Sequence, residues 1–157
     1  MKEKGTSIVI ETVSRVMIPF IQLFALYVII HGAGGPGGGF QGGVIFGASF
    51  ILYVIVYNWE GGRRRMPEAA NTAFSSLGLY IYAGIGLLAI LFSAGVAQYL
   101  NYGFVPFTSH FVENRALGME LVEIGIGTTV MAVTASIFFD LAAGGGEKEK
   151  GDEGRLH

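Results

Sequence analysis

The chain has 157 residues, of which 52% are hydrophobic and only 14% are charged, and its mean hydropathy is +0.54. Soluble domains usually carry about 25% charged residues, so this composition predicts a membrane protein. The formal net charge of -2 offers no basic surface for a nucleic acid. Because the chain has no cysteine, disulfides, thiolate catalysis and iron–sulfur ligation by this chain are excluded.

Four stretches are long and apolar enough to cross a bilayer, whose hydrocarbon core of roughly 30 Å needs about 20 mostly apolar residues in a helix. They are residues 14–30, 40–57, 77–100 and 117–141. The sequence therefore predicts an all-α membrane protein with a four-helix transmembrane domain over residues 1–143. We do not expect the first stretch to be a cleaved signal peptide, because the glycine-rich loop after it lacks a small-x-small cleavage site.

The basic residues are distributed unevenly across the predicted membrane. With four spans, the N-terminus, the middle loop and the C-terminus share one side, which holds nine of the ten Lys and Arg residues: Lys2, Lys4, Arg15, Arg63, Arg64, Arg65, Lys148, Lys150 and Arg155. Basic residues concentrate in cytoplasmic loops, so both termini are predicted to be cytoplasmic in a multi-pass protein of the cell membrane. Residues 144–157 begin with three consecutive glycines, followed by alternating Glu and Lys, which predicts a flexible charged cytoplasmic tail.

A glycine-rich segment follows the first predicted span. Within it, Gly37, Gly39 and Gly42 have the spacing of a dinucleotide-binding fingerprint. That fingerprint needs a preceding strand and a βαβ unit, whereas a membrane span precedes it here. A nucleotide site is therefore not expected.

The same glycines favour a tight turn and a close helix contact. Proline and glycine allow the chain to reverse at the membrane face, and the turn residues are Pro36, Gly37 and Gly38. Glycine then recurs every fourth residue at the start of the second span, at Gly39, Gly43 and Gly47. Small residues at this spacing let another helix approach closely. Simple loop flexibility is the alternative explanation of the glycines.

The fourth predicted span contains two glutamates, Glu120 and Glu123, which project from one face because they are three residues apart. Ionisable groups within a span usually face protein or water, and two neighbouring carboxylates in a low dielectric would share a proton or a cation. Both residues are therefore candidates for an ion path. The structural alternative places them in the first turns of the helix, where the helix dipole favours anions. We expect no catalytic residue, no metal site and no cofactor.

Other polar residues have simpler explanations. Arg15, near the cytoplasmic face, is expected to extend to the interface or bind a lipid headgroup. Four side chains within spans are expected to form hydrogen bonds between helices: Gln22, Ser49, Thr128 and Thr129.

Two segments, residues 15–19 and 31–43, resemble the MnhB/MrpB family, whose members are small membrane subunits of multi-subunit sodium/proton antiporters. The most specific part is the Pro-Gly-Gly-Gly-Phe core at residues 36–40. Residues 117–125 are also similar, so the resemblance covers about residues 8–142. The Gly-Gly pair before the core departs from the Asn-Ala or similar pair found in many members.

The resemblance implies an accessory subunit that takes part in Na+ or H+ transport beside other hydrophobic membrane subunits, without catalysis of its own. Related copies belong to archaeal respiratory complexes, including membrane-bound hydrogenases, sulfane-sulfur reductases and formate hydrogenlyases, and a plain antiporter is equally compatible. A self-sufficient homo-oligomeric channel or transporter is the main alternative. An enzyme is disfavoured, because the sequence shows neither a metal-ligand cluster nor a nucleophile–base pair.

Overall fold

The computed structural model describes residues 4–32, 34–93 and 98–153, and in these ranges the chain contains helices and loops but no strand. The elements are α1 (Lys4–Ile30), α2 (Gly39–Tyr57), α3 (Trp59–Arg65), α4 (Glu68–Phe92), the short 3-10 helix η1 (Tyr102–Phe104) and α5 (Phe111–Glu153). Four of the described helices contain segments long and apolar enough to span a membrane: Ile8–Ile30, Gly39–Tyr57, Glu68–Phe92 and Phe111–Ala143. The predicted all-α membrane fold with a glycine-rich turn between the first two helices is confirmed.

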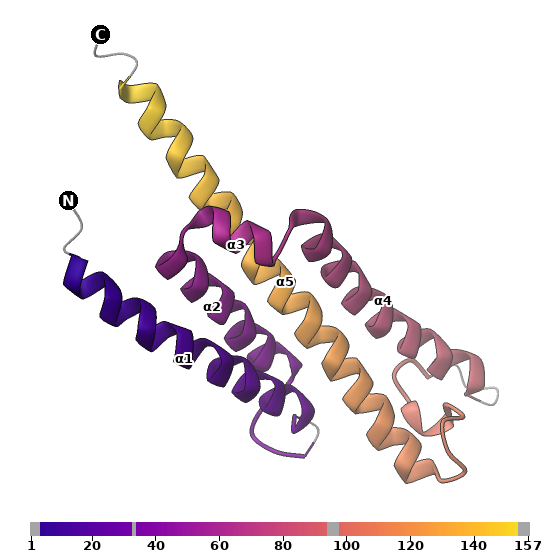
Figure 1. Cartoon of the computed structure of the whole chain (residues 1–157). Helices are drawn as coiled ribbons and strands as arrows, with labels where there is room; N and C mark the ends of the chain where they lie inside the picture. Colours follow the sequence, from indigo (N-terminus) through magenta and orange to yellow (C-terminus); the bar gives the residue numbers. More distant parts are fainter. Residues whose placement is uncertain (1–3, 33, 94–97, 154–157) are drawn as a thin grey trace.

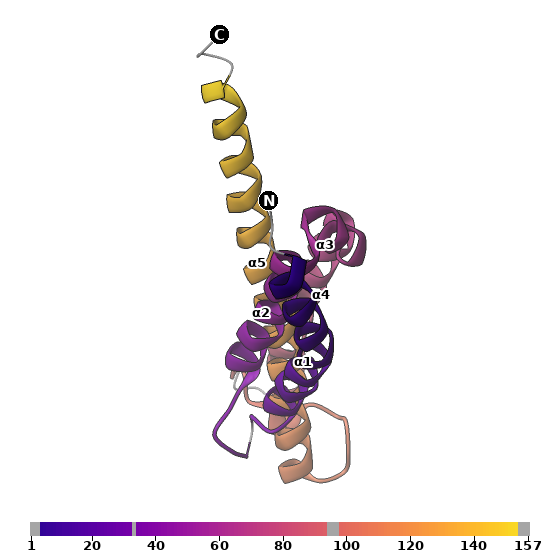
Figure 2. The ribbon, with the colours of Figure 1, turned by 60° about the vertical axis from the view of Figure 1, so that its left-hand side comes forward.

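The four long helices form a row in the order α1, α2, α5, α4 (Figure 1). α5 is central, with α2 on one side and α4 on the other, and α1 packs mainly on α2. In Figure 2 the helices overlap, as a row does when it is viewed from near its edge. Within the chain, only 22% to 33% of the apolar window of each span is buried. The remaining apolar surface therefore needs lipid or other subunits to cover it.

Successive spans run in opposite directions. The start of α1, the short helix α3 and the end of α5 therefore lie together at one end of the helix axes (Figures 1 and 2). An end of the row means here the place where the ends of its helices lie, not its outer helices α1 and α4. The glycine-rich turn and η1 lie at the other end. This arrangement agrees with an even number of crossings, while the side of the membrane on which each end lies stays a prediction.

The third span has different limits from those predicted, because α4 begins at Glu68 and ends at Phe92. Pro67 precedes the helix as its cap, a position that tolerates a residue without an N–H. Glu68 occupies the first turn, where the helix dipole favours an anion. The predicted end of the span is not helical, since Leu100 lies in a turn with a φ of 65°; residues 94–97 lie outside the described residues.

α5 is longer than predicted at both ends. It begins at Phe111 and continues through the three glycines at 144–146 to Glu153, where it projects beyond the other helices (Figure 1). The described part of the predicted tail is thus helical, and its flexibility in solution stays a prediction. The middle loop also contains a helix that was not predicted, α3.

An aromatic cluster holds α3 against α5. The ring of Trp59 meets that of Phe139 edge-on, with 5.1 Å between centroids. The guanidinium of Arg63 lies 4.4 Å from the centroid of Phe139, over its ring, a cation–π geometry. Phe139 is fully buried beside Val54 and Met66. This cluster fixes the arginine-rich helix α3 at the end of the row where α1 begins.

Candidate functional site

The glycine stripe of α2 lies directly against α5. A Cβ added to Gly43 would lie 2.6 Å from the carbonyl oxygen of Gly127, and one added to Gly39 would overlap the backbone of Glu123. No side chain fits at such distances, so the two backbones touch. Two pairs share this close approach of backbones, Gly39 with Glu123 and Gly43 with Gly127, while Gly47 packs against the side chain of Thr134. The small-residue face of α2 is therefore used within the chain, against the glutamate-bearing face of α5.

The Glu123 carboxylate lies between the glycine-rich turn and the start of α2. Its Oε2 atom is buried and has no hydrogen-bond partner among the described residues. A Cβ on Gly32 would overlap this oxygen, so the turn passes the carboxylate only because residue 32 lacks a side chain. The backbone amide of Gly39, the first residue of α2, interacts with the carboxylate, and the N-terminal end of a helix favours an anion.

The structural alternative for the two glutamates, a place in the first turns of their own helix, is wrong. α5 begins at Phe111, so Glu120 and Glu123 lie more than two turns inside it. Glu123 instead lies at the N-terminal end of a different helix, α2. A carboxylate in the middle of one helix and at the start of another is held by tertiary structure rather than by its local sequence.

Glu120 lies nearer the surface, in a hollow of about 540 Å³ beside the glycine-rich turn. The hollow is also lined by Tyr27, His31 and Pro36. The His31 ring stacks on Tyr27 with centroids 4.1 Å apart, and its Nδ1 lies 3.1 Å from the Tyr27 carbonyl oxygen. Glu123 follows Glu120 by one helical turn toward the interior. The structure therefore places an exposed carboxylate and a histidine at a hollow that lies one helical turn from Glu123, whose Oε2 atom is buried.

The backbone of the turn needs glycine for a second reason. Gly38 has a φ of 155°, a region that residues with a side chain rarely adopt. At Gly37 an added Cβ would lie 3.0 Å from the carbonyl oxygen of Val28. Pro36 is exposed and lines the hollow. Of the three predicted turn residues, Pro36 is thus the one that lines the hollow beside Glu120.

The predicted interhelical hydrogen bonds are only partly correct. Thr129 donates its hydroxyl to the Ser75 carbonyl of α4 at 3.2 Å, as predicted. Ser49 and Thr128 donate to carbonyls of their own helices, because a hydroxyl in a helix reaches the carbonyl three or four residues earlier. Gln22 lines a separate hollow at the other end of the row.

Asn71 is a buried polar residue that the sequence analysis missed. It lies on α4, and its Nδ2 donates to the Ala132 carbonyl of α5 at 3.1 Å and to the Ser136 hydroxyl. It escaped notice because it falls outside the predicted third span. Its position four residues after Pro67, in a helix with an apolar continuation, was the available signal. Asn71 joins α4 to α5 and is distant in sequence from the glutamates.

Within the described ranges, no three His, Asp or Glu side chains gather closely enough to hold a metal ion. The polar groups of the candidate site are therefore two carboxylates and a histidine around a glycine-rich turn. Such groups can exchange protons or bind a monovalent cation transiently, and they offer no set of ligands for a resident metal.

Comparison with known proteins identifies the family. A family model described as a domain related to the MnhB subunit of Na+/H+ antiporter matches residues 9–136. Proteins of Staphylococcus aureus and Staphylococcus epidermidis are 26% and 27% identical to the chain over 142 and 147 residues, covering 90% of this chain and 98% of each relative. Both are named "Putative antiporter subunit mnhB2". The match includes the turn, the α2–α5 contact and both glutamates, and it confirms the resemblance seen in the sequence. The chain belongs to the family of domains related to the MnhB subunit of Na+/H+ antiporters.

Proposed function

We propose that this chain is an accessory, non-catalytic subunit of a multi-subunit Na+/H+ antiporter-type module, in which it contributes to ion translocation and to assembly. Family membership supports the antiporter context. The assembly role is supported by the open row of helices, which leaves most of each span uncovered by the chain itself. A row with two exposed faces is suited to a position between larger membrane subunits.

The buried oxygen of Glu123 is the observation that carries the ion-path proposal. A buried carboxylate oxygen without a donor is unfavourable unless a proton or a cation satisfies it. Both transported species, H+ and Na+, can do so at the same atom. Because they compete for one carboxylate, binding of one ion displaces the other, which is the elementary requirement of antiport.

Access to this carboxylate is proposed to run through the hollow that Glu120 and His31 line. Glu120 is exposed there and lies one turn from Glu123. A second carboxylate near the opening raises the local concentration of cations, and the imidazole of His31 lines the same hollow. Neighbouring subunits would supply the remainder of the path, since the chain contributes a single layer of helices.

The location follows from the basic residues. We place the protein in the cell membrane with both termini in the cytoplasm, because Arg15 and the arginines of α3 lie toward the end of the row where α1 begins and α5 ends. In this orientation the hollow with Glu120 opens toward the outer side. The host is proposed to be a respiratory complex, such as a membrane-bound hydrogenase, in keeping with the sequence resemblance.

Affinity purification of the full chain from its native membranes in a mild detergent tests the accessory role. We expect several other hydrophobic subunits to co-purify, and an iron–sulfur or nickel protein among them would identify a respiratory host. The same chain alone in liposomes should carry no Na+/H+ exchange. Full exchange by the isolated chain would contradict the proposal and favour a homo-oligomeric transporter.

A further inference from the structure

We propose that the opposite end of the row holds a second site, which binds the phosphate headgroup of an anionic phospholipid. A hollow of about 570 Å³ lies between α1, α2 and α3. Its polar lining consists of two guanidiniums, an amide and two phenols, from Arg15, Arg65, Gln22, Tyr53 and Tyr57. No acidic residue is among the described residues that line it. The site is independent of the ion-path proposal, because it shares no residue with it.

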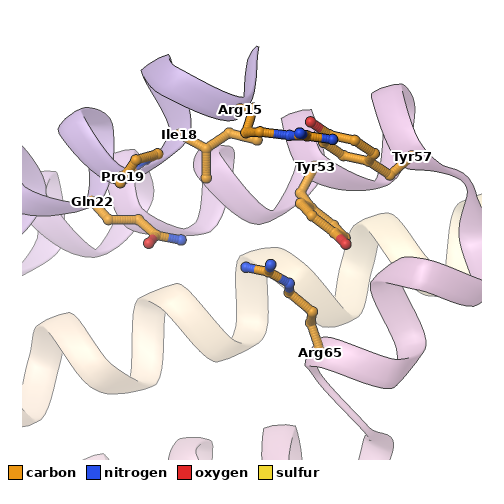
Figure 3. Close-up of a pocket in the computed structure, with 7 residues that line it drawn as sticks. All are labelled: Arg15, Ile18, Pro19, Gln22, Tyr53, Tyr57 and Arg65. Carbon is orange, nitrogen blue, oxygen red and sulfur yellow. The ribbon is translucent and has the colours of Figure 1, made fainter. Parts of the chain in front are cut away.

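The two arginines come from different helices. Figure 3 shows Arg15 extending from α1 alongside Tyr57 and Arg65 extending from α3, and both line the same hollow. The Arg65 guanidinium lies 4.6 Å from the centroid of the Tyr53 ring, which orients it by a cation–π contact. Guanidinium groups match the geometry of phosphate oxygens and can bind them bidentately. Two of them facing one hollow form a built site for a phosphate group.

The tyrosines fix the wall of this site. The Tyr57 hydroxyl donates a hydrogen bond of 2.9 Å to the backbone carbonyl of Glu11, which joins α2 to α1. Glu11, one turn before Arg15, has a further interaction of its own. Tyr53 and Tyr57 pack together with 4.8 Å between ring centroids. The polar end of the hollow is therefore held open by contacts between helices.

The hollow is adjacent to an apolar groove of about 310 Å³, and Arg65 lines both. Along α2 the lining residues change from polar to apolar in steps of three or four residues, which keeps them on one face of the helix: Tyr57, Tyr53, Phe50 and Phe46. On α1 the hollow is lined by Arg15, Ile18, Pro19 and Gln22, and the groove by Leu26 and Ile29. A phospholipid joins a polar headgroup to apolar acyl chains, so its headgroup suits the polar hollow and its chains suit the apolar groove.

Depth in the membrane agrees with this occupant. Arg15 lies seven residues inside the span Ile8–Ile30, about 10 Å along the helix, and a side chain of this length can reach the headgroup region. In the proposed orientation the site faces the cytoplasmic leaflet, whose anionic lipids attract basic residues. An acidic side chain of a neighbouring subunit could meet the arginines, but it would leave the apolar groove without an occupant.

The test uses the full chain reconstituted in bilayers of phosphatidylglycerol and phosphatidylcholine, extracted in mild detergent and examined by native mass spectrometry. We expect the wild type to retain phosphatidylglycerol in preference to phosphatidylcholine. The R15Q/R65Q double variant should bind it about tenfold more weakly or worse, because it loses two charge-assisted partners. R64Q removes the same kind of charge from an exposed position on α3 outside the hollow, and should leave retention unchanged.

Further arms separate the possible occupants. Circular dichroism checks the fold of each variant, and R15K/R65K, which keeps both charges, should lose less affinity than the glutamine pair. Inorganic phosphate in excess should not displace the lipid. Equal retention of the two lipids, an equal loss in R64Q, or displacement by phosphate alone would overturn the proposal. So would loss of a neighbouring subunit from the purified complex of R15Q/R65Q with its lipid content unchanged, which would identify a protein carboxylate as the occupant.

Discussion

A Cβ atom on Gly32 would occupy the space that Oε2 of Glu123 takes, so the turn packs directly on this buried oxygen because residue 32 has no side chain. The glycine-rich turn thus has a specific role beyond flexibility. It lets the backbone pass close to a carboxylate oxygen that is buried and that belongs to a membrane helix. The ion-path proposal depends on this contact, and the two residues are 91 positions apart in the sequence.

A methyl group on this turn should therefore interfere with the carboxylate. Gly32→Ala is expected to displace the Glu123 side chain and lower Na+-dependent proton movement by the whole complex about tenfold or more, since small displacements of a positioned group have large effects. Gly84→Ala on α4 is the control, because an added Cβ there meets nothing within 4 Å and Gly84 does not line the hollow. Transport assayed in proteoliposomes should distinguish the two variants. Equal activity would show that the contact between Gly32 and Glu123 has no role in transport.

The α2–α5 contact should be sensitive to one added carbon. In Gly43→Ala the new Cβ would meet the Gly127 carbonyl oxygen at 2.6 Å, and such overpacking typically costs about 1–3 kcal/mol of unfolding free energy. Gly84→Ala in α4 meets nothing within 4 Å and should be neutral or stabilising. Unfolding of the full chain by denaturing detergent measures both. A Gly43 variant as stable as Gly84→Ala would show that the two backbones are further apart than described.

Asn71 should contribute to the packing of α4 on α5. Asn71→Ala removes the donor to the Ala132 carbonyl and the Ser136 hydroxyl, and the loss is expected to cost about 1–3 kcal/mol. Thr72→Ala changes the neighbouring exposed residue and should alter the unfolding free energy little. The same detergent titration compares them. If both variants unfolded at the same detergent concentration as the wild type, the hydrogen bonds of Asn71 would make no net contribution to the unfolding free energy.

The topology can be tested because the chain has no cysteine of its own. Arg64 and Gly35 are both exposed and lie at opposite ends of the row. A single cysteine at either position should react with a membrane-impermeant maleimide from opposite sides of sealed vesicles, with Arg64→Cys labelled from the cytoplasmic side. Labelling of both from one side would contradict the four-span arrangement.

Much of the fold could be predicted from the chain's composition and apolar runs. Four membrane helices, their even number and the turn at Pro36 all follow from local sequence. The limits of α4 could not be found from the longest uncharged stretch, because Glu68 belongs to the helix and lies in its first turn. A helix end at a membrane surface tolerates charge, so the absence of charge is a poor guide to where a span begins.

The candidate site was predictable only in part. The spacing of Glu120 and Glu123 put them on one face, and the glycine spacing put Gly39 on a packing face. Contacts between distant segments bring these two faces together and place Gly32 against the Glu123 carboxylate. The hollow between Arg15 and Arg65 has the same origin, because it is formed by three helices. A single sequence contains no signal for such pairings.

The most direct test of the central claim is ion transport by the assembled complex carrying the Glu120→Gln, Glu123→Gln double substitution, with Glu113→Gln as control. Glu113 is an exposed glutamate near the start of the same helix and lies outside the site. The account predicts that Na+-dependent proton movement falls sharply in the double variant while subunit composition stays complete, that Glu123→Gln alone accounts for most of the loss, and that the control is unaffected. Transport at the wild-type rate in a fully assembled double variant would contradict the account.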